Sequence, residues 1–176
     1  QIDIQYFIKL RDPMYLNTIK YHCPEALISS YLDSIKSNSF LNKGAVFDTE
    51  NLVKERNRIN DFLTDRGFYN FNKEFIYFDI DTNYVTNTVN ITLGIQNYKK
   101  IDKINNSFQD LTHKQFKISK VNIQIGDSSK FNNIAKLDSI ENSFFKIVNY
   151  HPINFNSKVI KNSIFFKKDD FYKKSI

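Results

Sequence analysis

Two separate stretches of this sequence carry the same interrupted alternation of apolar residues. The first passes through Met14, Leu16, Ile19, Tyr21 and Cys23, and the second through Phe116, Ile118, Val121, Ile123 and Ile125. An alternation of period two indicates a β-strand with one buried face, and the gap in each copy indicates a bulge or a short bend. Because the interrupted pattern occurs twice, we predict that one supersecondary unit is repeated along the chain.

A second pair of segments supports this repeat. KGAVFDTENL, which begins at Lys43, aligns with the final segment KKDDFYKKSI. The alignment matches Phe47 with Phe171 and places Phe171 in a core, whereas Lys168 takes the position of Gly44. The second copy is longer, and we assign its extra residues to an insertion at 127–152.

The apolar period changes to that of a helix after the first strand. A helix should start at Pro24, whose missing N–H costs nothing in a first turn. A second helix should run from Thr49 to Arg66, with Asp48 as its N-cap. Gly67 suits the left-handed residue that often follows the end of a helix.

Two strands should follow these helices, over 75–81 and 86–95, because both segments return to alternation. One face of the second strand is apolar and consists of Val89, Ile91, Leu93 and Ile95. The order strand, helix, helix, strand, strand predicts an α+β fold, with two helices packed on a three-stranded sheet.

The remaining segments suggest how the chain is divided. Residues 2–10 alternate as well, and we assign 1–12 to the closing strand of a preceding unit. Residues 13–97 would then form one complete unit. The polar and charged stretch 98–114 is interpreted as a linker, and 115–176 as a partial second unit.

Composition excludes several classes of protein. Of the 176 residues, 41% are hydrophobic, which is enough to build a core. The single cysteine rules out an internal disulfide framework, and no apolar run reaches the roughly 18 residues that a membrane-spanning helix needs. We find no signal-peptide pattern. The four glycines are scattered, so no phosphate-binding loop is expected.

The net charge of +6 raises the question of an anionic partner. An aromatic and basic cluster near the end of the chain resembles a surface that stacks single-stranded nucleic acid or lies near acidic lipid. It contains Phe165, Phe166, Phe171 and Tyr172 among Lys167, Lys168, Lys173 and Lys174. A basic RNA-binding domain is therefore one alternative. However, an RNA reader usually places aromatic residues on the exposed face of its sheet, and the polar face of 86–95 carries none.

No residue set has the pattern of an active site. His22 and Cys23 are adjacent, so on a strand they point to opposite faces, and His113 and His151 lie in separate segments. We therefore expect no enzyme activity, no metal and no cofactor.

Two groups of charged residues receive a structural interpretation. Asp79 and Asp81 share a strand face, as paired carboxylates or cation ligands would, but their place at a strand end favours a solvated edge. A second group is interpreted as an exposed ion-pair face of the second helix and contains Glu55, Arg56, Arg58 and Asp61.

The segment KGAVFDTENLVKERNRINDFLTDRGFYNF, followed by FIYFDIDT, resembles the polypeptide-transport-associated (POTRA) domain family. These domains stand in tandem ahead of the outer-membrane barrel in BamA-like and TamA-like assembly factors. The resemblance is carried by Gly44, Phe47, Asp48, Leu52, Glu55, Arg56, Ile59, Leu63, Gly67 and Phe68.

This resemblance implies tandem β-α-α-β-β units with mixed sheets on the periplasmic side of the bacterial outer membrane. It implies as partners outer-membrane protein precursors, accessory periplasmic or lipoprotein subunits and the chain's own C-terminal barrel, and no nucleic acid. An open sheet edge would bind client chains by strand addition, along Phe75, Ile76, Tyr77, Phe78, Asp79, Ile80 and Asp81. A purely structural scaffold that binds no client is the other alternative.

Overall fold

The computed structural model of the chain describes residues 2–7, 12–102, 107–126, 138–149 and 157–174. It divides into two compact units, which we describe one at a time. Unit 1 comprises Gln1–Thr64 and Asn70–His113, and unit 2 comprises Asp65–Tyr69 and Lys114–Ile176. Helices and mixed sheets are both present, which confirms the predicted α+β class.

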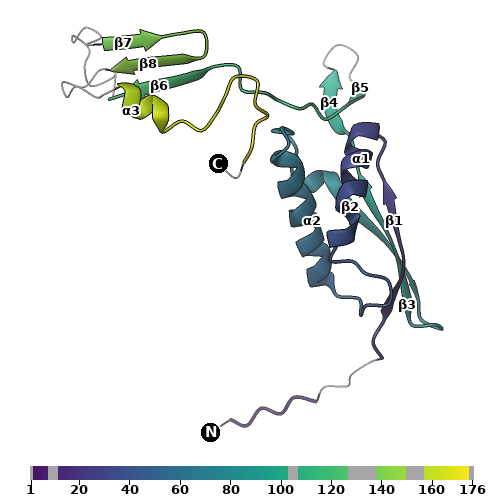
Figure 1. Cartoon of the computed structure of the whole chain (residues 1–176). Helices are drawn as coiled ribbons and strands as arrows, with labels where there is room; N and C mark the ends of the chain where they lie inside the picture. Colours follow the sequence, from purple (N-terminus) through teal and green to yellow (C-terminus); the bar gives the residue numbers. More distant parts are fainter. Residues whose placement is uncertain (1, 8–11, 103–106, 127–137, 150–156, 175–176) are drawn as a thin grey trace. The chain divides into compact units, whose positions relative to one another are not determined.

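Unit 1 has the predicted order of strand, helix, helix, strand, strand. Its main elements are β1 (Tyr15–His22), α1 (Ala26–Ile35), α2 (Thr49–Thr64), β2 (Ile76–Asn83) and β3 (Thr88–Ile95), with 3₁₀ turns η1 (Lys36–Asn38) and η2 (Lys73–Phe75). The sheet order is β1-β3-β2, with β1 parallel to the central β3 and β2 antiparallel to it. Both helices cover the same face of this sheet (Figure 1).

The core of unit 1 lies between the helices and the sheet. The alternating residues of β3 are fully buried there, and they meet an apolar stripe from α1 and another from α2. The buried hydrophobic residues described in unit 1 are Leu16, Ile28, Leu32, Ile35, Leu41, Leu52, Ile59, Leu63, Phe71, Ile76, Val89, Ile91, Leu93 and Ile95. The bulge predicted in the first strand is confirmed, because the register with β3 shifts between Leu16 and Thr18.

The predicted helix boundaries are confirmed in part. The predicted start of the first helix at Pro24 is wrong, because α1 begins at Ala26 with Glu25 as its N-cap and Pro24 precedes it. The backbone N–H of Glu50 donates to Oδ1 of Asp48 at 2.8 Å, so Asp48 caps α2 as expected. The helix ends at Thr64, two residues earlier than predicted. Gly67 follows with φ +92°, which is the left-handed conformation that glycine adopts without strain.

Glu55 contradicts the predicted exposed ion-pair face, because its side chain is fully buried. Its Oε1 accepts from Arg58 Nη2 at 2.6 Å and from Ser39 Oγ at 2.9 Å. Its Oε2 accepts from Arg58 Nε at 2.9 Å and from the backbone N–H of Phe40 at 3.1 Å. Arg58 also donates to the carbonyl of Ile35, where α1 ends. One carboxylate thus joins α2 to the segment that connects the two helices.

That connecting segment continues along the outer side of β1. The backbone N–H of Phe47 donates to the carbonyl of Met14 at 2.7 Å, and that of Gly44 donates to the carbonyl of Leu16 at 2.6 Å. Gly44 has φ +83°, so it turns the chain in a way that a β-branched residue would resist. The beginning of β1 is therefore hydrogen-bonded on both sides.

Unit 2 contains a second three-stranded sheet with the same pattern of pairing. Its strands are β6 (Val121–Ile125), β7 (Asp138–Glu141) and β8 (Phe145–Asn149), and a short helix α3 (Ser157–Asn162) follows them. The order is β6-β8-β7, with β6 parallel to β8 and β7 antiparallel to it, as for β1, β3 and β2. Here, however, the hairpin of β7 and β8 precedes the helix, and it lies within the predicted insertion at 127–152.

The hydrogen bonds beside β1 are repeated in unit 2. Tyr172 N–H donates to Phe116 O, and Asp169 N–H donates to Ile118 O, in the manner of Phe47 and Gly44 in unit 1. Asp169 also has a positive φ, +69°. The structural equivalent of Gly44 is therefore Asp169.

The sequence alignment of the second copy was wrong by one residue. Tyr172, rather than Phe171, takes the position of Phe47, and Lys168 is not the counterpart of Gly44. Phe171 is 39% exposed and lies under the ammonium group of Lys117, so its predicted place in a core is also wrong. The physical reason is that aspartate tolerates a left-handed conformation, so the turn needs no glycine.

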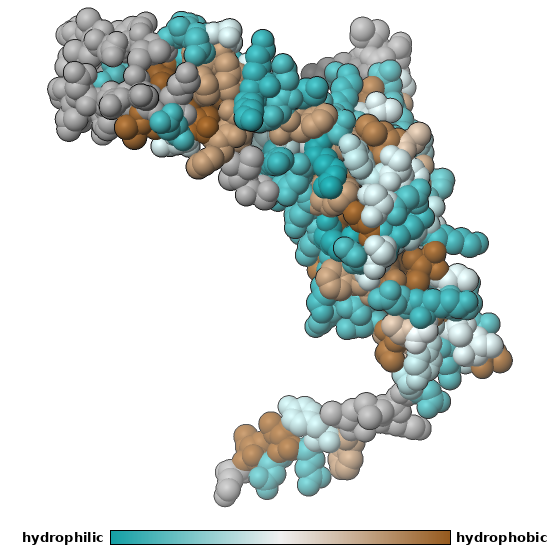
Figure 2. All heavy atoms as spheres, viewed as in Figure 1, coloured by the Kyte–Doolittle hydropathy of each residue, from teal (hydrophilic) through white to brown (hydrophobic). Residues whose placement is uncertain are grey.

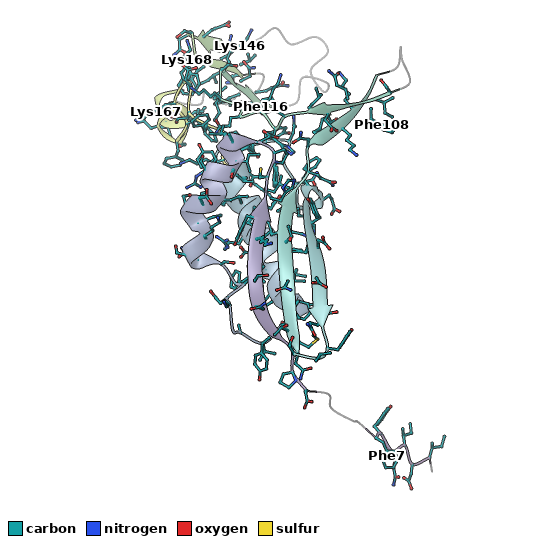
Figure 3. All side chains as sticks on the ribbon, turned by 90° about the vertical axis from the view of Figure 1, so that its right-hand side faces the viewer. Phe7, Phe108, Phe116, Lys146, Lys167 and Lys168 are labelled. Atoms are coloured by element: carbon teal, nitrogen blue, oxygen red, sulfur yellow. The ribbon has the colours of Figure 1, made fainter. Side chains whose placement is uncertain are left out.

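The segment interpreted as a linker contains a hairpin. Strands β4 (Tyr98–Asp102) and β5 (Ser107–Leu111) pair antiparallel, with Ile101 opposite Phe108 and Lys99 opposite Asp110. The frequent charges in this segment concealed its alternation. Phe108 on this hairpin is 73% exposed, and its side chain is labelled in Figure 3.

Residues 2–7, at the start of the proposed closing strand, pair with no strand in the described parts of the chain. The apolar side chains among them are exposed, which Figure 2 shows as brown spheres beside polar ones. Their assignment to a preceding unit stays a prediction.

Substitution of the buried carboxylate tests its structural role. We predict that Glu55→Ala lowers the free energy of unfolding by about 3–5 kcal/mol, because it leaves the Arg58 guanidinium without its buried partner. Chemical denaturation followed by circular dichroism measures this change. Glu50→Ala, the same substitution at an exposed position of α2, should change it by less than about 1 kcal/mol. Equal effects of the two variants would contradict the role given to Glu55.

Candidate functional site at the open edge of the first sheet

Strand β2 lies at the edge of the first sheet and pairs only with β3 among the described strands. The N–H of Gln96 donates to the carbonyl of Phe75 at 3.0 Å, which makes this a hydrogen-bonded pair of the antiparallel ladder. Such pairs alternate along the strand, so the backbone groups of Tyr77, Asp79 and Asp81 bond to β3. Those of Phe78, Ile80 and Thr82 therefore point away from the sheet.

These outward groups form the feature that a partner strand would use. An unpaired row of N–H and C=O groups accepts a further strand through backbone hydrogen bonds. Phe75, the first residue predicted for this edge, belongs to the 3₁₀ turn η2 instead. The N–H of Ile76 bonds back to Lys73 in this turn, so the available edge begins at Phe78.

Tyr77 lies across the central strand on the face opposite the helices. A Cβ placed on Gly94 would come within 2.0 Å of the Tyr77 ring, so the ring occupies the space that the glycine leaves. Tyr77 is directly opposite Gly94 in the ladder. A glycine within a strand often marks such a close approach, and the Tyr77 ring supplies it here.

Beyond Tyr77, the same face is polar. Asn90 accepts hydrogen bonds at Oδ1 from Asn17 and Thr18 of β1, at 3.1 and 2.7 Å. Its amide group faces Asp81 Oδ2 at 3.5 Å. These side chains, together with Asp79, line a shallow groove of about 440 Å³ across the three strands. Figure 3 shows the strands side by side with the helices behind them.

On the helix-facing side of β2, burial decreases along the strand. Ile76 is buried, Phe78 is half-buried, and Ile80 is 38% exposed. The guanidinium of Arg56 lies 5.2 Å from the centre of the Phe78 ring, a cation–π contact between α2 and β2. Ile80 thus presents aliphatic surface at the open edge.

The residues that carried the family resemblance have structural roles, in the core or in turns of the backbone. Leu52, Ile59, Leu63 and Phe68 are buried, and Phe47 packs against the core of unit 1. Gly44 and Gly67 supply positive φ angles. None of these residues lies on β2, so they support the site through the fold.

The histidines and the cysteine form no reactive cluster in the described residues. No group of three or more His, Cys, Asp or Glu side chains there is arranged to hold a metal ion. Burial raises the pKa of the Cys23 thiol, so this residue is a poor nucleophile at neutral pH. The His113 ring packs edge-on against Phe71 and Phe75, whereas His151 lies outside the described residues.

The comparisons with family models, curated proteins and solved structures find no match to this chain. Among the described residues, the structure contains no helix that is long and apolar enough to cross a membrane.

The contact between Tyr77 and Gly94 yields a prediction about stability. Gly94→Ala should lower the free energy of unfolding by about 1–3 kcal/mol, because the new methyl group displaces the Tyr77 ring. In the background Tyr77→Ala, the same substitution should cost much less, because the ring is absent. A double-mutant cycle by chemical denaturation measures the difference, and strict additivity would contradict the packing described here.

Proposed function

We propose that this chain is the periplasmic POTRA region of an outer-membrane barrel assembly or translocation factor, and that it binds extended client chains. The observation that carries the proposal is the open edge of β2, whose outward backbone groups run from Phe78 to Thr82. Strand addition at such an edge depends on the backbone and places few demands on side chains. This property suits a protein that handles many different barrel precursors.

Three further features support the POTRA assignment. Unit 1 has the β-α-α-β-β order with a β1-β3-β2 sheet, and this is the arrangement that the resemblance implies. Unit 2 has a sheet with the same pairing pattern and the same hydrogen bonds beside its first strand. A repeated unit of this kind suits a tandem array. Accessory periplasmic or lipoprotein subunits and a C-terminal barrel are the further partners that this function requires.

The alternative of an RNA-binding domain receives less support. The face of the first sheet that RNA would contact carries Asp79 and Asp81 at its edge, and carboxylates repel phosphate. Of the aromatic side chains on this face, Tyr77 packs against Gly94, and Tyr15 lies at the other end of the sheet, opposite Thr88.

Proline substitution tests client binding at the edge. Ile80→Pro removes an outward N–H that β3 does not use, so the β2–β3 ladder keeps its bonds. We expect it to weaken binding of a fluorescent, alternating Val-Thr peptide by about tenfold or more, since one strand bond is lost and its neighbours are displaced. Fluorescence anisotropy measures the affinity.

Ile80→Val is the matched control, because it alters the same side chain but keeps both the N–H and an exposed aliphatic surface. It should bind the peptide with an affinity close to that of the wild-type chain. Circular dichroism and the unfolding midpoint establish that both variants are folded. If the wild-type chain binds no such peptide, or if Ile80→Pro binds as well as Ile80→Val, the purely structural scaffold becomes the better explanation.

A further inference from the structure

Two aspartates lie at the open edge of a chain whose net charge is +6. Asp79 and Asp81 are both exposed on β2, and their alternate spacing places both side chains on the face away from the helices. Neither forms an ion pair with any residue in the described parts of the chain. The edge is thus a local site of negative charge on a basic protein.

The residue between these aspartates has the opposite character. Ile80 points to the helix-facing side and remains 38% exposed. Its neighbour Phe78 on that side is covered by Arg56, so Ile80 is the exposed aliphatic contact there. Along the edge, the residues from Asp79 to Asp81 are therefore negatively charged, apolar and negatively charged in turn.

The alternation of hydrogen bonds along β2 places the side chains of a partner strand close to the two aspartates. Because Asp79 and Asp81 bond to β3, an antiparallel strand added outside β2 would meet them as non-hydrogen-bonded pairs. In such pairs the Cα atoms are about 4.5 Å apart and the side chains are closer than in hydrogen-bonded pairs. The charge of the partner residue would therefore matter most at these two positions.

We infer that the β2 edge selects extended segments with the pattern basic, apolar, basic, in which Lys or Arg faces Asp79 and Asp81 and the central residue packs on Ile80. This inference rests on the proposed function, since it specifies the client of the same edge. Opposite charges directly across a strand pair favour binding, and like charges oppose it.

We expect the strand added to β2 to come from a client chain. A second copy of this protein is less suitable as the source of that strand. The other edge of the sheet, β1, carries Lys20 on the same face, which suits Asp79 by charge. However, the start of β1 is already hydrogen-bonded to the segment from Gly44 to Phe47. A free peptide meets no such obstruction.

Three peptides that differ only at two positions test this selection. Each has Val-Thr alternation at both ends and a central Lys-Val-Lys, Gln-Val-Gln or Asp-Val-Asp. We expect the full chain to bind the Lys peptide about tenfold more tightly than the Asp peptide in fluorescence anisotropy. The difference should diminish at high salt. The net charge of +6 would by itself favour the Asp peptide, so the expected order opposes the overall field.

Charge reversal on the protein supplies the control. The double variant D79K/D81K should prefer the Asp peptide, whereas D33K/D61K, which makes the same change in net charge on the exposed surfaces of α1 and α2, should keep the wild-type order. The neutral variant D79N/D81N should lose the Lys preference and keep only the salt-sensitive bias toward the Asp peptide that the net positive charge produces. Analytical ultracentrifugation without peptide tests for a second copy at this edge. Any self-association of the wild-type chain should persist in D79K/D81K.

The outcomes separate the inference from the function on which it rests. Equal binding of the three peptides, with loss in Ile80→Pro, would overturn charge selection and leave strand addition intact. A Lys preference that survives D79K/D81K would also overturn the inference. Self-association that depends on the two aspartates would show a second copy to be the occupant. Failure of every peptide to bind would refute the proposed function itself.

Discussion

The buried carboxylate of Glu55 is the interaction on which unit 1 depends. It accepts four hydrogen bonds, from Arg58 twice, from Ser39 and from Phe40. Because a buried charge is tolerated only when it is paired and fully hydrogen-bonded, these bonds fix the chain that leaves η1. That chain then runs beside the start of β1 and hydrogen-bonds to Met14 and Leu16, whereas β2 pairs only with β3 among the described strands.

The open edge combines a backbone that any extended chain can bind with side chains that distinguish one chain from another. Outward backbone groups offer hydrogen bonds to any extended chain, whereas Asp79, Ile80 and Asp81 provide the chemical pattern by which chains would differ. Tyr77, held over Gly94, stiffens the face beside them. The edge is therefore well defined before a partner arrives, which limits the ordering cost of binding to the partner itself.

The sequence predicted most of unit 1, because alternating and helical periods are local signals. The bulge after Leu16, the Asp48 cap and the buried face of β3 all follow from neighbouring residues. It did not predict the burial of Glu55, since a carboxylate at a helical i, i+3 distance from an arginine has the pattern of a surface pair. Its partners Ser39 and Phe40 come from a distant segment. The predicted register of the second copy was also wrong, because an aspartate, Asp169, adopts the positive φ that Gly44 has in the first copy. At the candidate site, the sequence predicted the edge strand. Only the structure shows which of its residues hydrogen-bond to β3 and which point their backbone groups outward.

Amide hydrogen exchange measured by NMR, with and without an extended peptide, tests the central claim most directly. In the free chain, the amides of Tyr77, Asp79 and Asp81 should be protected by β3, while those of Phe78, Ile80 and Thr82 exchange quickly. Saturating peptide should protect the second set and leave the first unchanged. Protection that appears elsewhere in the chain while Phe78, Ile80 and Thr82 still exchange quickly would contradict strand addition at this edge.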